Sequence, residues 1–161
     1  MKLRYKIING FLTVLGVAMI ALAISISYSS DCSPATSIES DSNRMKAIVS
    51  RCYGGPEALQ FVDIEKPQAG PKDVIVKVHA AAVNPLDYHY MRGSPYLMRL
   101  ALGIGSPNDQ RMGVDFSGVV AEVGSEVTKF SVGDAVFGGG AGAFAEYLRI
   151  GEDGALAIKP D

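Results

Sequence analysis

Thirteen residues in the middle of the chain, AAVNPLDYHYMRG from Ala81 to Gly93, concentrate the side chains best suited to chemistry. They include an amide, a carboxylate, an imidazole and two phenols. Such a group is typical either of an active-site loop or of a well-capped helix start. Both interpretations stay open on spacing alone.

The capping interpretation explains three of these residues. Pro85 suits the first turn of a helix, because its missing N–H would have no partner there. Asn84 then becomes the N-cap and Asp87 the N3 residue of a capping box, which predicts a short helix over 85–92. The three polar aromatic residues at 88–90 are left unexplained, and at least one of them should face a cavity or solvent.

No metal site is predicted from this stretch. Asp87 and His89 offer only two ligands, at a spacing that does not share one helical face. The second histidine, His79, falls within a predicted strand and is expected to be packed there. Cys32 and Cys52 have no second Cys or His at short spacing, so we expect unpaired thiols, with a single disulfide as the alternative.

A glycine-rich segment, FGGGAGAFAEY at 137–147, could bind a nucleotide. Gly138, Gly140 and Ala143 fit the G-x-G-x-x-A dinucleotide fingerprint. A helix following it would be unusually short, however, and AFAEYLRI alternates equally well as a strand. We therefore predict a glycine-rich bend between two strands.

Short segments of alternating apolar and polar residues dominate the chain from residue 45 onward. Seven of them, separated by turns rich in glycine and proline, lie at 45–53, 58–65, 73–83, 116–124, 134–138, 143–150 and 155–160. With short helical pieces at 85–92 and 96–103 they predict a mainly β fold, a small barrel or sandwich. The 161 residues leave room for one such domain, which we place at 45–161.

The amino-terminal segment differs from the rest. Lys2, Arg4 and Lys6 precede the uncharged run at 7–27, which as a helix would cross a hydrocarbon core of about 30 Å. We predict a transmembrane anchor, with a cleaved signal peptide as the alternative, because the run is longer than a usual signal-peptide core. The positive-inside rule places the basic end, residues 1–6, in the cytoplasm and the domain outside.

The remaining polar segment and the overall charge carry less information. Residues 28–44 are rich in serine and contain little to bury, so they are predicted to form a flexible tether. The net charge of -2 comes from dispersed charges, which argues against a nucleic-acid partner.

Six motifs follow one another in a specific order: MKAIV, YGGPEALQF, VIVKVHAAAVNPLDYHYMRG, GVDFSGVVAEVG, FSVGDAVFG and GAFAEY. In this order they resemble the GroES-like catalytic domain at the amino terminus of the medium-chain dehydrogenase/reductase superfamily. Within it they are most similar to the zinc-independent quinone oxidoreductase (zeta-crystallin-like) branch. The resemblance covers nearly all of residues 45–161 and implies a GroES-like small β-barrel with short helices.

The resemblance also implies chemistry without a metal. Zinc alcohol dehydrogenases of the superfamily have a cysteine and a Gly-His-Glu motif where this chain has NPLD and Gly113, Val114 and Asp115. Without thiolate or imidazole ligands there, zinc-alkoxide chemistry is not expected. The implied reaction is hydride transfer from NADPH to a quinone or enone, which polarises its own double bond while donors stabilise the developing enolate oxygen.

Site residues are carried over by position from the family's pattern. The catalytic candidates are Asn84, Tyr88 and His89, the cofactor contacts are Asn84 and Asp87, and the substrate-pocket residues are Tyr90 and Tyr96. The family's usual tyrosine position falls at or next to His89.

The family's coenzyme-binding Rossmann domain would follow Asp161. We therefore expect the catalytic half of a membrane-anchored NADPH-dependent oxidoreductase, inactive alone and able to form a homodimer at full length. The alternative is a non-catalytic GroES-like binding module displayed at the membrane. An exported domain conflicts with the cytoplasmic location of reduced nicotinamide cofactors, and a protease-protection experiment would resolve the conflict.

Overall fold

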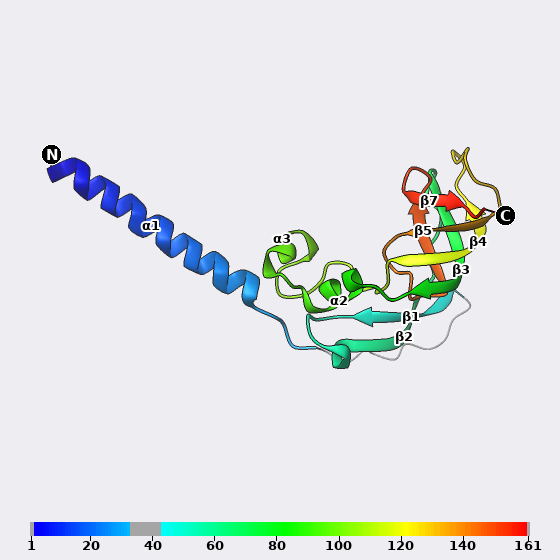
Figure 1. Ribbon diagram of the computed structural model, residues 1–161, viewed down its shortest axis with the longest axis horizontal. Helices are drawn as coiled ribbons and strands as arrows, with labels where there is room; N and C mark the ends of the chain where they lie inside the picture. The colour runs from blue at the N-terminus through cyan, green and yellow to red at the C-terminus, as the bar shows by residue number, and fades with distance from the viewer. Residues whose placement is uncertain (1, 33–42, 161) are drawn as a thin grey trace.

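A computed structural model describes residues 2–32 and 43–160, and it consists of one long helix attached to a mainly β domain (Figure 1). The helix, α1, spans Lys2–Ser27 and projects away from the domain. Its segment Arg4–Ser27 is long and apolar enough to cross a membrane, and none of its most apolar stretch is buried. A signal sequence would meet the same criterion.

The described part of the chain contains seven strands, as the sequence predicts. Their bounds are β1 Arg44–Ser50, β2 Leu59–Glu65, β3 Asp73–Ala82, β4 Asp115–Val123, β5 Ala135–Gly139, β6 Tyr147–Gly151 and β7 Ala155–Ile158. The larger sheet has the order β6-β3-β4-β5-β7, and β1 pairs with β2 separately. All of these pairings are antiparallel. The prediction of a mainly β fold is confirmed, as a curled sheet whose outer strands are β6 and β7.

Two apolar clusters hold the domain together. The larger is built from the inward faces of the curled sheet, and its fully buried members include Val74, Val76, Val136 and Leu148. The smaller belongs to β1, whose inward residues Met45, Ala47 and Val49 pack with Ala145. Alternate residues of β1 face inward because successive side chains of a strand point to opposite faces.

Strand β3 departs from strict alternation. Its register against β4 shifts between Ile75 and Val76 and again between Val78 and Ala80, as at β-bulges. The second shift falls at His79, whose side chain is exposed. The expectation that His79 is packed within its strand is therefore wrong, because His79 lies on the face of β3 opposite the core-facing Val74, Val76 and Val78, where Lys77 is exposed as well.

Short helices connect the strands at the end of the domain nearest α1 (Figure 1). They are η1 Pro56–Ala58, α2 Pro85–Arg92, η2 Tyr96–Met98 and α3 Arg99–Leu102. Both predicted helical pieces are thus confirmed. α2 ends at Gly93, which adopts a left-handed conformation with φ of 56° that a side chain would disfavour.

The glycine-rich segment is a bend. β5 ends at Gly139, residues 141–144 form a turn, and β6 begins at Tyr147. The described segment contains no helix after its glycines, so the bend is confirmed and the dinucleotide fingerprint is ruled out here.

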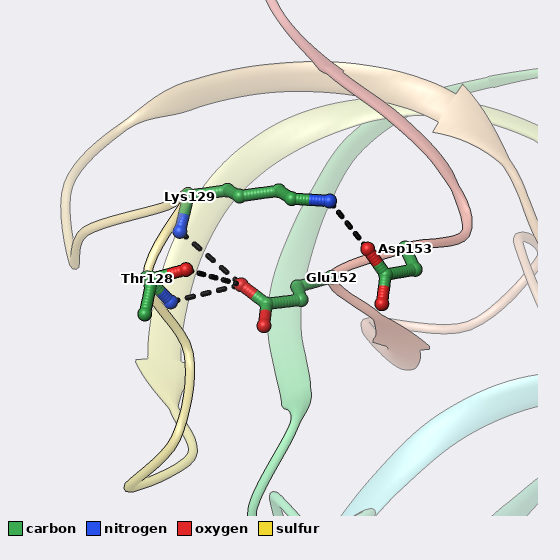
Figure 2. Close-up of polar contacts among 4 residues, drawn as sticks. All are labelled: Thr128, Lys129, Glu152 and Asp153. Atoms are coloured by element: carbon green, nitrogen blue, oxygen red, sulfur yellow. Dashed lines mark hydrogen bonds and ion pairs between the residues drawn. The ribbon is translucent and has the colours of Figure 1, made fainter.

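A polar cluster ties the β4–β5 loop to the turn between β6 and β7 (Figure 2). The buried Glu152 accepts hydrogen bonds through Oε2 from the Thr128 N–H at 2.8 Å and the Lys129 N–H at 3.2 Å. The Lys129 ammonium pairs with Asp153. The Thr128 N–H lowers the pKa of Glu152 most, opposed by burial and supported by the Lys129 N–H. This cluster stabilises the fold and lies outside the candidate site.

Residues 28–32, which the sequence assigns to a flexible tether, are held against the domain. Ser29 forms an isolated parallel bridge with Gly105, and the Ser30 N–H donates to the Gly105 carbonyl at 2.8 Å. Cys32 and Cys52 form a disulfide, with 5.1 Å between their Cα atoms. The expectation of unpaired thiols is therefore wrong, because docking of this segment brings together two cysteines that are 20 residues apart. The predicted tether otherwise falls mostly on residues 33–42, outside the described residues.

Candidate functional site

The start of α2 fixes Asn84 at the open end of strand β3. Asn84 Oδ1 accepts from the Leu86 N–H at 2.7 Å and from the Asp87 N–H at 3.4 Å. In return, Asp87 Oδ2 accepts from the Asn84 N–H at 2.8 Å. The predicted capping box is confirmed, and it determines which way the Asn84 amide points.

The amide nitrogen of Asn84, which the cap does not use, reaches the beginning of β4. Its Nδ2 donates to Asp115 Oδ2 at 2.7 Å. The register of the sheet makes this contact, because Asp115 pairs with Ala82, two residues before Asn84. The two segments that the resemblance aligns with zinc-binding motifs, 84–87 and 113–115, therefore meet in space, and an amide–carboxylate pair joins them.

This donor set does not fit zinc. The Asn84 amide oxygen is engaged by the cap and its nitrogen by Asp115, so neither atom is free to coordinate. Protein zinc sites use thiolate, imidazole and carboxylate ligands, usually four in number. Within residues 2–32 and 43–160, no three His, Cys, Asp or Glu side chains group closely enough to hold a metal ion.

Tyr88 and His89 follow on α2 as a pair of aromatic side chains. Their ring centroids are 5.7 Å apart in an edge-to-face arrangement, and the Arg92 guanidinium lies 5.0 Å from the Tyr88 ring centre. His89 Nδ1 is 2.6 Å from the Ser94 carbonyl oxygen. Because a carbonyl only accepts, this contact places the proton of neutral His89 on Nδ1 and leaves Nε2 as an acceptor. Tyr88 is exposed, as expected for at least one of the three aromatic residues.

Tyr90 faces a cavity of about 210 Å³ between α2, α3 and the loop before β4. The lining is Tyr90, Ala101, Leu102, Pro107, Asn108, Asp109, Arg111, Met112, Gly113 and Ala141. Tyr96 does not line this cavity, and its ring instead lies 4.7 Å from the Arg99 guanidinium. Of the two predicted pocket residues, the structure thus places one at the cavity.

A charged pair borders the cavity. Arg111 Nη2 and Asp109 Oδ2 are 2.6 Å apart, and Arg111 Nε donates to Asp109 Oδ1 at 3.0 Å. Burial alone would raise the pKa of Asp109, but hydrogen bonds from Arg111 outweigh it and lower that pKa. The hydrogen bond that Arg111 donates to Asp109 correspondingly raises the pKa of Arg111. Sequence reasoning missed this pair, which lies in a segment without a strand or helix signal.

A second recess lies beside Asn84, where the end of β3 meets the beginning of β4. It has a volume of about 270 Å³ and is lined by Ala80, Ala81 and Ala82 of β3 with Asp115, Phe116 and Ser117 of β4. Val83, which follows directly, is 82% exposed. Small side chains and an uncovered apolar residue leave this face able to receive a flat ring or another domain.

Asp87 is buried, with 4% of its surface exposed. Its Oδ2 belongs to the cap, whereas its Oδ1 is buried without a hydrogen-bond partner among the described residues. A buried carboxylate oxygen is costly to leave unpaired, but this one lines neither the cavity beside Tyr90 nor the recess beside Asn84.

Comparisons with known proteins place this geometry in a family. The alcohol dehydrogenase GroES-like domain family matches residues 70–161. A quinone oxidoreductase of Pseudomonas aeruginosa is 36% identical over 118 residues, which cover 72% of this chain and 34% of that protein. A trans-enoyl reductase of Penicillium is 36% identical over 126 residues, covering 73% of this chain and 32% of that protein.

A solved structure agrees with the sequence relatives. The Escherichia coli quinone oxidoreductase complexed with NADPH superposes with a TM-score of 0.60 at 26% identity, covering 71% of this chain and 33% of that one. The chain thus spans about a third of the length of the relatives it matches.

Proposed function

The chain belongs to the alcohol dehydrogenase GroES-like domain family of the medium-chain dehydrogenase/reductase superfamily, and we propose that it is the catalytic portion of a zinc-independent quinone or enone oxidoreductase. The observation that carries the proposal is the contact between Asn84 and Asp115. It occupies the place of a metal site with groups that cannot hold zinc, and it presents a fixed amide at an open recess.

The chain's own residues would bind the coenzyme and the substrate and would donate a proton to the substrate. Asn84 would orient the reacting rings through its fixed amide, while the recess of small side chains would receive the nicotinamide. NADPH, when bound, supplies the hydride. Asp87 is buried and would act on the coenzyme by holding Asn84, whose N–H donates to Asp87 Oδ2. These features fit the cofactor bound by the Escherichia coli relative.

The quinone or enone would occupy the neighbouring cavity that Tyr90 lines. Reduction of either substrate places negative charge on an oxygen, which needs a donor or a proton. Tyr88 and His89 are the candidates, since the phenol of Tyr88 is exposed and the His89 ring packs edge-to-face against it. Tyr96 would contact a substrate only where that substrate extends beyond the cavity.

We place the enzyme at a membrane, anchored by α1 with the domain on the outer side. The length and exposure of Arg4–Ser27 support the anchor. The disulfide between Cys32 and Cys52 supports the outer side, because disulfides persist in oxidising compartments. On the outer side, the enzyme requires a supply of reduced nicotinamide, or of another hydride donor, outside the cytoplasm.

The test is turnover by this chain produced together with the coding sequence beyond codon 161. We expect that sequence to encode a βαβ unit with a glycine-rich turn, and the product to oxidise NADPH with a quinone acceptor without added zinc. Asp115→Ala should lower the rate, whereas Glu122→Gln, an exposed carboxylate elsewhere on β4, should leave it unchanged. Stoichiometric zinc held by this part of the protein would contradict the proposal.

A second candidate function is a non-catalytic binding module displayed at the membrane. The disulfide favours it, because an oxidising compartment lacks the cytoplasmic supply of reduced nicotinamide. It predicts a stop codon directly after codon 161 and no NADPH-dependent turnover by the purified protein. The same sequencing and assay therefore separate the two candidates.

A further inference from the structure

The end of α1 is joined to the domain by Arg99, which is 3% exposed. Arg99 Nη1 donates to the Tyr28 carbonyl at 2.7 Å, to the Ser29 hydroxyl at 3.0 Å and to the Ile26 carbonyl at 3.2 Å. On its other side, Arg99 Nε donates to the Gly93 carbonyl at 2.9 Å. One guanidinium thus connects the last turn of α1 with the end of α2.

This contact stabilises the helix end in two ways. The last carbonyls of a helix lack partners within the helix, and the guanidinium supplies donors to them. Its positive charge also lies at the negative end of the helix dipole. The rings of Tyr53 and Tyr96 lie 4.3 Å and 4.7 Å from the guanidinium, which supplies cation–π contacts.

Two further ties lie within five residues of the end of the helix. Ser29 and Ser30 are bonded to Gly105, and Cys32 is bonded to Cys52. Gly105 follows α3, while Cys52 follows β1, so the ties reach separate parts of the domain. Together, these contacts fix the position and the orientation of the η2–α3 segment relative to the end of α1.

An apolar surface surrounds this joint, and we call it the collar. It consists of Tyr28, Tyr96, Leu97, Leu100 and Ile104, whose side chains are each between 51% and 67% exposed. Leu97 and Leu100 are three residues apart, so they share one side of the η2–α3 segment. Tyr28 lies next to Gly105, the neighbour of Ile104, because a Cβ built on Gly105 would be 3.3 Å from the Tyr28 ring. Apolar side chains thus continue from the helix onto the domain.

The length of α1 sets the level of the collar. Tyr5 and Tyr28 lie at opposite ends of the apolar run, and 23 steps at about 1.5 Å separate them by roughly 35 Å, close to the thickness of a bilayer core. Tyrosine is enriched at both membrane–water interfaces. With Tyr28 at one interface, the joint holds Tyr96, Leu97, Leu100 and Ile104 at the same level.

We propose that the collar is a lipid-contacting surface, which lies in the membrane interface and holds the domain against the bilayer. The inference rests on the proposed membrane anchor. Lipid is the occupant because the collar is continuous with the apolar helix and fixed at its interfacial end. α3 carries both surfaces: Leu100 belongs to the collar, whereas Ala101 and Leu102 line the cavity. The cavity therefore lies beside the same short helix that would contact lipid, the phase into which an apolar quinone partitions.

The absence of tryptophan from the chain allows a direct test. Single tryptophans would replace Leu97 or Leu100 in the collar, Leu15 in the middle of α1, and Val132 as the control. Val132 is exposed and belongs to the loop between β4 and β5. That loop lies at the end of the domain opposite α1 (Figure 1). The full chain would be placed in phosphatidylcholine vesicles with bromine on the acyl chains at a shallow or a deep position, and tryptophan emission would be measured.

The tryptophan emission of Leu97→Trp and of Leu100→Trp should be blue-shifted and should be quenched most by bromine at the shallow position. The emission of Leu15→Trp should be quenched most by bromine at the deep position. The emission of Val132→Trp should be quenched by neither. If Leu15→Trp is quenched while both collar variants behave like Val132→Trp, the collar proposal is overturned and the anchor stands. If Leu15→Trp is not quenched either, both are overturned. A concentration-dependent blue shift of the collar variants in lipid-free detergent would show that a second copy covers the collar, which also overturns the proposal.

Discussion

Asn84 Nδ2 donates a hydrogen bond of 2.7 Å to Asp115 Oδ2, across 31 residues of sequence. The same Asn84 side chain caps α2 through its oxygen, so its two ends serve two elements. One atom sets where the helix begins and the other attaches that beginning to β4. This division makes the capping and the site-forming roles of Asn84 separable by mutation.

Substitutions at Asn84 and Asp115 should separate these roles. Asn84→Ala should lower the free energy of unfolding by about 1 kcal/mol, because the helix loses its cap. Asn84→Ser should cost less, since a hydroxyl still accepts from the helix N–H groups. Asp115→Ala leaves the cap intact and should change stability by less than about 0.5 kcal/mol. Urea unfolding of the three variants checks this order, and a loss at Asp115 as large as at Asn84→Ala would contradict it.

Glu152 should contribute to the acid sensitivity of the domain. Its pKa in the folded state is lowered, chiefly by the Thr128 N–H, from an ordinary value of 4.5. The stability that Glu152 contributes is therefore fully present above pH 4.5 and is lost as the pH falls through the lower pKa of the folded state. Glu152→Gln should flatten the fall in melting temperature in this acid range. Glu122→Gln, on the exposed side of β4, serves as the control and should keep the slope of the unaltered chain.

Gly118 should tolerate no side chain. A Cβ at this position would lie 2.1 Å from the Lys77 carbonyl oxygen, part of the neighbouring strand β3. Gly118→Ala should therefore destabilise by about 3 kcal/mol or more, at or beyond the upper range for overpacking. Gly139→Ala is the matched control, because its Cβ would approach nothing closer than 3.8 Å. Equal melting temperatures for the two variants would show that the strands separate easily at Gly118.

The cysteine pair should report the side of the membrane on which the domain lies. On the oxidising side, neither Cys32 nor Cys52 should react with a maleimide polymer added to denatured cells before reduction, and both should react afterwards. In the cytoplasm both thiols would be labelled at once, and the outer placement would be wrong. A gel-mobility shift measures this directly.

Removal of the disulfide should loosen the joint at the end of α1. The bridge closes a segment of 20 residues, a length for which chain entropy predicts about 3 kcal/mol of stabilisation. Cys52→Ser should therefore lower the melting temperature, and proteolysis should become faster within residues 28–44. The conservative variant Ser50→Ala, which removes a hydroxyl bonded to the Cys52 carbonyl, should have a smaller effect.

Much of the secondary structure of this protein can be predicted from local sequence patterns. Alternating apolar residues place the seven strands, and Asn84, Pro85 and Asp87 set the start of α2. These features depend on neighbours in the chain, since capping and alternation act over one to four residues. The apolar run of α1 is equally local.

Tertiary structure decided what depends on distant partners. The register of β3 against β4 brings Asp115 to Asn84, while packing of the valine face of β3 against the core leaves His79 on the exposed face. The disulfide and the Arg99 contacts join segments separated by 20 and by about 70 residues. No local pattern records such pairings, because a side chain's partner is set by how the sheet curls and where the short helices pack against it.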